Sequence, residues 1–212
     1  MVFLKPYPLF IGRGKMTDET LFFGRCYHLY CAGNPKEAIF RLEADYQAFL
    51  DLFRMYVNPI VNLYGYCLLP THFHLLLRIK EKKEIEYVYG DNSMLWVQFS
   101  NLFRAYLRYV NGKYQRSGSL IHRQITREVP RDKALLSALV VYMHQNPQIF
   151  GIVSDFRIWP FSSCYAYMRQ DRRSMIAKET LLDPVFQKRI VEAQVLSQRQ
   201  VSDWEGDFNQ IQ

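Results

Sequence analysis

The sequence lacks the features that mark several classes of protein. No apolar run approaches the ~20 residues that a membrane-spanning helix requires. The four cysteines are widely spaced, none of them forms a Cys-x-x-Cys pair, and neither a signal peptide nor an internal repeat is visible. We therefore expect a soluble cytoplasmic protein with reduced thiols and no membrane partner.

The residues that are abundant indicate a packed core and a basic surface. Hydrophobic residues make up 49% of the 212 residues and aromatic residues 16%, which is enough for one well-packed domain. The formal net charge is +7, and the 15 Tyr and 15 Phe suit a polyanion whose bases can stack, such as single-stranded nucleic acid. We expect a leader over residues 1–23, a single domain over 24–168 and an appendage over 169–212.

A His-x-His pair lies in an apolar, β-prone run over residues 66–77. Pro70 marks a turn, so the residues that follow are predicted to form a buried strand. Residues two apart in a strand point to the same face, so His72 and His74 should project side by side while Phe73 points to the opposite face. Two neutral imidazoles held in this way are half of a divalent-metal site.

The remaining pattern predicts an α+β fold. Strands are expected over 24–31, 60–69 and 72–79, with a short strand or irregular edge within 120–129. Amphipathic helices are expected over 44–57, 95–110 and 132–146, the last capped by Asp132 and closed by Pro147. This order favours a ferredoxin-like antiparallel sheet with helices packed on one side.

A third metal ligand is sought on the helix that ends near Pro147. Tyr142 and Asn146 are spaced i, i+4 and share a helix face, so the Asn146 amide oxygen could complete a site that accepts Mg²⁺ or Mn²⁺. Tyr142 would then face the same ion and could attack a metal-polarised phosphate to form a covalent ester. His144 and Gln145 are alternative ligands or surface groups, whereas His28 and His122 are interpreted as ordinary hydrogen-bonded side chains.

Taken in order, several stretches resemble the REP-associated tyrosine transposases, a single-tyrosine branch of the HUH superfamily. The resemblance covers roughly residues 24–168, and its most specific elements are a His-hydrophobic-His after Pro-x and a later Tyr-x-x-x-Asn-Pro. The matching stretches are Tyr27-His28-Leu29-Tyr30, Gly33-Asn34, residues 66–76, Phe99-Ser100-Asn101 through Tyr106, Asn111 with Lys113-Tyr114, Gly118-Ser119-Leu120, Tyr142-Met143-His144-Gln145-Asn146-Pro147 and Trp159-Pro160-Phe161-Ser162-Ser163.

The resemblance implies an HUH nuclease-like fold and a DNA nicking and joining enzyme. It implies that His72, His74 and Asn146 bind the divalent ion and that Tyr142 is the nucleophile. Its substrate would be single-stranded DNA near a hairpin formed by a palindromic repeat, with cleavage leaving a 5′-phosphotyrosine link and a free 3′-hydroxyl. A monomer or a homodimer would act, associated with the nucleoid when bound to DNA.

Two other functions stay open at this point. One is a non-catalytic, domesticated protein that binds hairpin DNA, and the other is an RNA-binding ferredoxin-like module that stacks bases on sheet aromatics such as Tyr66 or Phe73. For either DNA-binding function, the side chains expected to follow phosphates cluster around the second helix and the turn after it. They are Arg104, Arg108, Lys113, Arg116, Arg123 and Arg127.

Overall fold

The computed structural model describes residues 21–32, 38–85, 93–120, 125–169 and 174–177, together with residue 192. Residues 1–20 and most of 169–212 lie outside this range, so the expected leader and appendage stay predictions. In chain order the elements are β1 (Cys26–Ala32), α1 (Glu43–Tyr56), β2 (Val61–Leu69), β3 (His72–Ile79), α2 (Ser93–Lys113), β4 (Thr126–Glu128), α3 (Lys133–Ile149) and α4 (Cys164–Arg169), with 3₁₀ turns over Asn58–Ile60, Lys82–Glu84 and Phe156–Ile158.

The strands form one antiparallel sheet in the order β2-β3-β1-β4. With α1 and α2 inserted in the chain, β1 to β4 follow the β-α-β-β-α-β order of the ferredoxin-like fold. The predicted α+β class is therefore confirmed, and the short strand expected within 120–129 is β4. The register of the two central pairings places His74 opposite both Tyr30 and Cys67.

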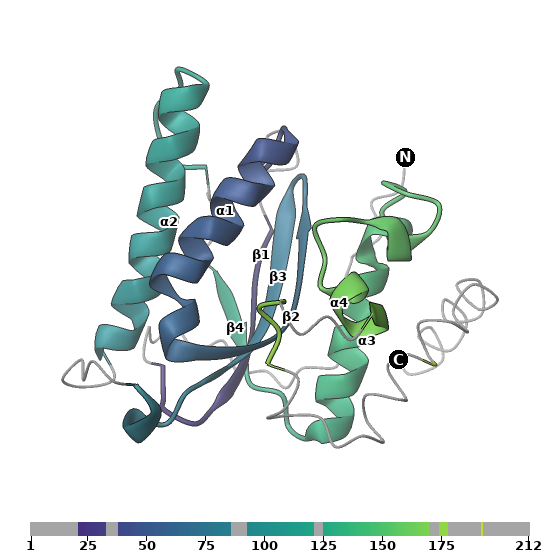
Figure 1. The fold of residues 1–212 in the computed structure, drawn as a ribbon. Helices are drawn as coiled ribbons and strands as arrows, with labels where there is room; N and C mark the ends of the chain where they lie inside the picture. Colours follow the sequence, from purple (N-terminus) through teal and green to yellow (C-terminus); the bar gives the residue numbers. More distant parts are fainter. Residues whose placement is uncertain are drawn as a thin grey trace, which may run out of the picture.

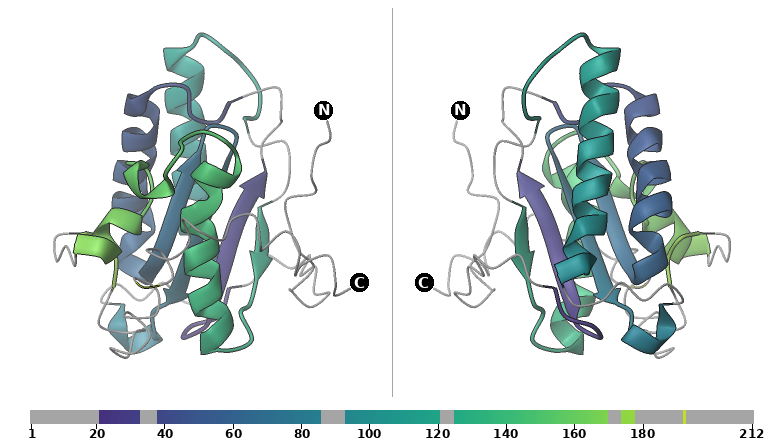
Figure 2. Two further views of the ribbon diagram at one scale, coloured as in Figure 1. Left: turned by 90° about the vertical axis from the view of Figure 1, so that its right-hand side faces the viewer. Right: turned by 90° about the vertical axis from the view of Figure 1, so that its left-hand side faces the viewer.

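Different helices cover the two faces of the sheet (Figures 1 and 2). Helices α1 and α2 pack together on one side, as expected, where the Phe73 ring lies 5.3 Å from Phe49 between centroids. The opposite face is covered by α3, which approaches β2 closely at Gly65 (Figure 2). A Cβ at Gly65 would lie 2.9 Å from the Met143 methyl carbon, so glycine permits this approach.

Helix α3 begins as predicted but ends later. Asp132 caps it, its Oδ1 accepting a hydrogen bond of 2.8 Å from the Leu135 amide. The prediction that Pro147 closes the helix is wrong, because α3 continues to Ile149. Proline removes a single helical hydrogen bond, and near a helix end the chain can compensate: the Phe150 amide still donates to the Asn146 carbonyl at 2.9 Å. The extra turn carries Phe150 over the sheet.

The segment after α3 follows the outer edge of β2. The Leu68 amide donates to the Phe161 carbonyl at 2.9 Å, and the Ser163 amide donates to the Tyr66 carbonyl at 2.9 Å. The Trp159 indole donates to the Leu68 carbonyl at 2.9 Å. Residues 159–163 therefore protect an otherwise open sheet edge.

No helix within residues 21–32, 38–85, 93–120, 125–169 and 174–177 is both long and apolar enough to cross a membrane. All four cysteines are described, and all are free thiols.

Candidate active site

The two histidines of β3 lie side by side on the face that α3 covers. The ring centroids of His72 and His74 are 5.6 Å apart, and the rings are nearly perpendicular. Phe73 points to the other face and is completely buried under α1 and α2. Alternation along β3 therefore places the two imidazoles on one face of the sheet and Phe73 in the core on the other, as the sequence predicts.

Helix α3 crosses this face and contacts both imidazoles. The Tyr142 ring lies edge-on to His74 at 6.3 Å between centroids, and the Phe150 ring lies 4.6 Å from His72. Asn146 is midway between these two residues at the same i, i+4 spacing, so it shares their helix face. Tyr142 and the histidine pair are thus brought together from segments about 70 residues apart in sequence, and helical spacing places Asn146 on the same face of α3 as Tyr142.

Nε2 of His72 and both Oδ1 and Nδ2 of Asn146 are buried without a hydrogen-bond partner, and so are Nδ1 of His28 and Oε2 of Glu128 next to His74. The Asn146 side chain is completely buried. Buried polar atoms are nearly always paired, because an unpaired one costs about 1–3 kcal/mol. Bare nitrogen and oxygen donors at the predicted ligand positions fit a divalent ion.

The histidines are in the protonation state that metal binding requires. Burial lowers the pKa of His72 to about 4. Burial, reinforced by the neighbouring His28 and His72, holds the pKa of His74 well below its ordinary value. Both imidazoles are therefore neutral near pH 7, with a lone pair available for a ligand bond.

Tyr142 is a protonated phenol in this structure. Burial raises its pKa to about 12, so the oxygen carries its proton near neutral pH. A nearby divalent cation stabilises the phenolate and reverses that effect. Any nucleophilic role for Tyr142 would therefore require a cation beside the phenol.

The donor set is mixed rather than carboxylate-rich. Among the residues that the structure describes, no group of three or more His, Cys, Asp or Glu side chains is placed to hold a metal ion. The candidate centre consists of His72, His74 and the Asn146 amide oxygen, with the remaining positions left to water and phosphate oxygens. Mg²⁺ and Mn²⁺ favour oxygen-rich coordination of this kind.

The alternative ligands suggested by the sequence lie elsewhere or act differently. His144 is completely buried, and its Nε2 lies 2.6 Å from the Ser163 hydroxyl, which in turn donates to the Tyr66 carbonyl at 3.2 Å. This histidine therefore ties α3 to the segment along β2. His28 is hydrogen-bonded, as predicted, but its partner is His74: Nε2 of His28 lies 3.1 Å from Nδ1 of His74. His122 lies outside the described residues.

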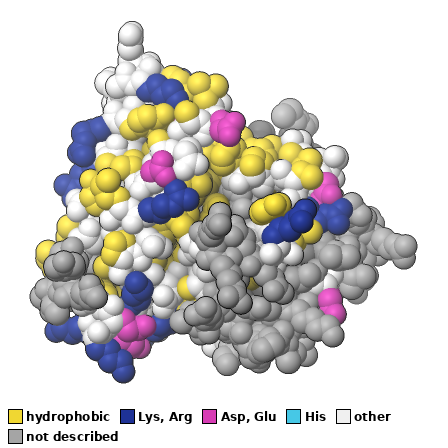
Figure 3. All heavy atoms as spheres, viewed as in Figure 1, with side chains coloured by type: hydrophobic (Ala, Val, Ile, Leu, Met, Phe, Trp, Pro, Cys, Tyr) yellow, Lys and Arg dark blue, Asp and Glu magenta, His cyan; other side chains and the backbone are white. Residues whose placement is uncertain are grey.

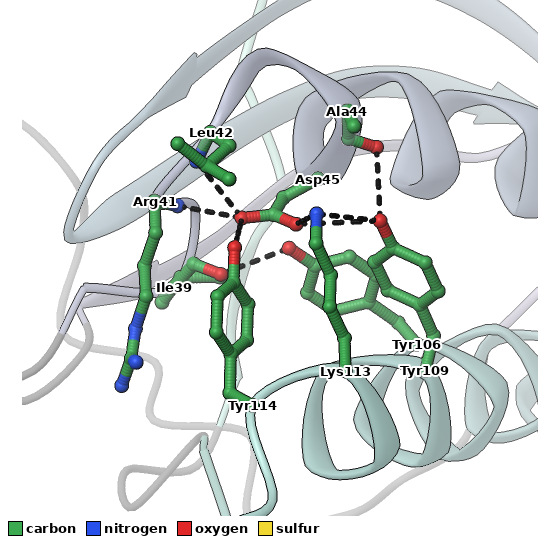
Figure 4. Close-up of polar contacts among 9 residues, drawn as sticks. All are labelled: Ile39, Arg41, Leu42, Ala44, Asp45, Tyr106, Tyr109, Lys113 and Tyr114. Atoms are coloured by element: carbon green, nitrogen blue, oxygen red, sulfur yellow. Dashed lines mark hydrogen bonds and ion pairs between the residues drawn. The ribbon is translucent and has the colours of Figure 1, made fainter.

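Lys113, one of the predicted phosphate contacts, is an exposed residue that pairs with a buried carboxylate between α1 and α2 (Figure 4). Its ammonium lies 2.6 Å from Oδ1 of Asp45, which is completely buried. Oδ2 of Asp45 also accepts hydrogen bonds from the Arg41 and Leu42 amides, both at 2.9 Å, and from the Tyr114 hydroxyl at 2.7 Å. Lys113 thus stabilises the packing of the two helices.

The other predicted phosphate contacts that the structure describes lie on or next to α2. Arg104 and Arg108 are exposed on α2, where Lys and Arg side chains are visible at the surface in Figure 3. Arg116 donates to the Asn111 side chain at 3.0 Å, and the nearly buried Arg127 lies over the Trp96 ring at 4.8 Å. Helix α2 lies on the opposite side of the sheet from α3, the helix that contains Tyr142 (Figure 2). Arg123 lies outside the described residues.

Sequence reasoning missed the residues beneath His74. Tyr30 and His28 of β1 lie on the same face of the sheet as His74. Glu128 of β4 is next to them, because it pairs with His28 in the sheet register. The Tyr30 hydroxyl donates to Oε1 of Glu128 at 2.9 Å. The strand predicted over residues 24–31 would place His28 and Tyr30 on one face, but only the strand register shows which residues they contact.

Comparisons with known proteins support the architecture. Neither a family model nor a curated protein matches the chain. A solved structure, described as a REP-associated tyrosine transposase bound to a REP hairpin, aligns with a TM-score of 0.55 at 15% identity. The alignment covers 79% of this chain and 94% of that chain. The protein therefore shares its overall fold with that transposase.

Proposed function

We propose that the protein is a metal-dependent endonuclease and strand transferase that cleaves single-stranded DNA near hairpins, with Tyr142 as the nucleophile. The observation that carries the proposal is the position of α3. It sets a tyrosine against His74 and, one turn later, a buried asparagine with a bare amide oxygen. The shared fold with a transposase that was solved with a REP hairpin supports this choice over other phosphate chemistries.

The reaction uses each of these residues in a defined role. His72, His74 and Asn146 would hold Mg²⁺ or Mn²⁺, and a bound ion supplies Lewis-acid polarisation of the scissile phosphoryl group. The Tyr142 oxygen forms a bond to phosphorus and loses its proton. The bond from phosphorus to the 3′-oxygen breaks, and that oxygen takes up a proton. The products are a 5′-phosphotyrosine ester and a free 3′-hydroxyl.

A tyrosine ester suits strand transfer better than hydrolysis does. The ester keeps a reactive phosphodiester on the protein, so a 3′-hydroxyl can attack it and restore a continuous strand. Attack by water would discard that bond. The phenol is held on a helix that packs directly on the sheet at Gly65, so its position relative to His74 is fixed by the core.

The experiment is a trapping assay with a hairpin-bearing single-stranded DNA labelled at its 3′ end. With Mg²⁺ or Mn²⁺, a labelled protein should appear on a denaturing gel, whereas a 5′ label should be released on a shorter strand. EDTA should prevent both. Tyr142→Phe should form no adduct, and the control Tyr109→Phe, on α2, should form it normally. An undiminished adduct with Tyr142→Phe would show that the nucleophile is misassigned.

The two alternative functions give different results in the same system. A non-catalytic hairpin binder would retain the DNA equally well in EDTA and yield no adduct with any hairpin. An RNA-binding module would prefer an RNA hairpin to the matched DNA hairpin in competition. The structure disfavours base stacking on Phe73, because that ring is buried against Phe49 and Phe103.

A further inference from the structure

We infer that His28 and Glu128 are positioning residues that fix the tautomer and orientation of His74 for metal binding. The inference rests on the proposed function, since it concerns one ligand of the same centre. It assigns a role to a buried histidine and a carboxylate that the cleavage step itself does not use.

The three side chains lie next to one another across β4, β1 and β3. Nε2 of His28 is within hydrogen-bond distance of Nδ1 of His74, at 3.1 Å. Nδ1 of His28 faces Oε2 of Glu128 at 3.5 Å, which is ion-pair distance, although neither atom has a hydrogen-bond partner. The rings of His28 and His74 are stacked, with centroids 5.3 Å apart and planes 13° from parallel. His28 is completely buried, so this arrangement is not shared with solvent.

The proton positions follow from the groups that His28 faces. A carboxylate can only accept, so the nitrogen of a neutral His28 that faces Glu128 is the one that carries hydrogen. Nε2 of His28 then has no hydrogen and accepts through its lone pair, so Nδ1 of His74 must donate the hydrogen bond between the two rings. A neutral His74 with its proton on Nδ1 has the lone pair on Nε2, which is the form a metal ligand needs.

Nδ1 of His72 also has a partner in the protein. Its Nδ1 lies 3.1 Å from the Thr71 hydroxyl, and its Nε2 is the bare buried atom. Both histidines therefore have Nδ1 engaged by the protein. Because Nδ1 of each ring has a partner in the protein, Nε2 of each ring is the atom that would bind the ion.

Tyr30 keeps the carboxylate in place. Its hydroxyl donates to Oε1 of Glu128 at 2.9 Å, which leaves Oε2 directed toward His28. The Tyr30 ring also lies 6.0 Å from His74 and 5.1 Å from His28 between centroids. His74 is thus supported from below by two β1 rings and contacted by Tyr142 from α3.

The first test measures Mn²⁺ affinity by calorimetry without DNA. His28→Phe keeps the ring but removes both nitrogens, and it should weaken Mn²⁺ binding about 10–100-fold, as loss of a ligand's orienting partner typically does. His28→Gln, whose amide oxygen can accept from Nδ1 of His74, should recover much of that loss. The control His144→Gln alters another buried histidine on α3 and should leave the affinity unchanged.

The second test needs no variant, so it holds even if His28→Phe fails to fold. Nitrogen-15 NMR of histidine-labelled protein without metal should show His28 and His74 each protonated on Nδ1 alone. A proton on Nε2 of His74, or a doubly protonated His28, would overturn the inference. Equal Mn²⁺ affinity in His28→Phe would overturn it while leaving the metal site intact; a wild-type protein that binds no Mn²⁺ would remove the site itself.

Discussion

The buried Asp45 carboxylate and the buried side chains of His72 and Asn146, on different sides of the sheet, differ in their hydrogen bonding. Between α1 and α2, the buried carboxylate of Asp45 accepts from two amides, a lysine and a tyrosine (Figure 4). On the α3 face, Nε2 of His72 and the two side-chain amide atoms of Asn146 are buried without a hydrogen-bond partner. A saturated polar group contributes stability, whereas a bare one costs stability and is retained for a ligand. The comparison separates residues that stabilise the fold from residues that we propose as ligands of an ion.

The largest expected effect is a difference in stability between two substitutions at neighbouring residues of β3, whose side chains point to opposite faces of the sheet. Phe73→Ala should lower the free energy of unfolding by about 3–5 kcal/mol, because it leaves a cavity in the core. His72→Ala should change it by less than about 1 kcal/mol, since a buried nitrogen without a partner is removed together with the ring. Urea denaturation measures both. Equal losses in the two variants would refute the distinction between the faces.

The second prediction concerns stabilisation by metal. Mn²⁺ at 100 times its dissociation constant should raise the free energy of unfolding by about 2.7 kcal/mol, because it binds the folded chain. Asn146→Ala should abolish most of this gain and leave the metal-free stability nearly unchanged or higher, since both of its amide atoms are bare. Thermal unfolding with and without Mn²⁺ measures the difference.

Asn146→Asp is the informative partner of that variant. A carboxylate in place of the amide should bind Mn²⁺ at least as tightly as the wild type. His144→Gln, the matched control, should keep the full metal-dependent gain. If Asn146→Ala also keeps it, Asn146 is not a ligand and the bare amide needs another explanation.

Local patterns predicted one half of the site well. The bounds of β3 agree with the prediction to the residue, and the two-residue period alone placed His72 and His74 on one face. The shared face of Tyr142 and Asn146 likewise follows from helical spacing. Each of these features depends on residues close together in sequence.

Features that depend on distant pairings could not be predicted. His28 and His74 are 46 residues apart, and only the antiparallel register of β1 against β3 brings them together. Lys113 is 68 residues from Asp45, so its pairing with this buried carboxylate could not be inferred from local sequence, and its predicted contact with phosphates stays a prediction. The extension of α3 past Pro147 also needed the packed structure, because proline near a helix end usually terminates it.

A third, smaller effect is expected in acid. Burial alone raises the pKa of Asp45, but hydrogen bonds from Lys113, Leu42, Tyr114 and Arg41 outweigh it and lower the pKa to about 2. A carboxyl whose folded pKa lies below its unfolded value stabilises the protein above the unfolded pKa. The contribution, about 2 kcal/mol, is lost as pH falls from about 4 toward 2.

Urea unfolding of wild type and Asp45→Asn between pH 2 and pH 6 isolates this contribution. Asp45→Asn should be less stable at pH 6, and the two proteins should converge as pH falls. Taking the difference removes the titration of other carboxylates, such as Asp155 beside Arg157. Parallel curves would show that the Asp45 network does not depend on its charge.

The smallest expected effect tests which face the DNA touches. Arg104 and Arg108 are predicted to contact phosphates, yet α2 lies across the sheet from α3, the helix that contains Tyr142 (Figure 2). If the DNA reaches α2, Arg104→Ala and Arg108→Ala should each weaken hairpin binding uniformly across sequences. Each should also reduce the slope of log affinity against log salt by about 0.7–0.9. Fluorescence anisotropy over a salt series with Tyr142→Phe as the background measures this without cleavage. An unchanged slope would confine the DNA to the histidine face, where binding and chemistry would then share one surface.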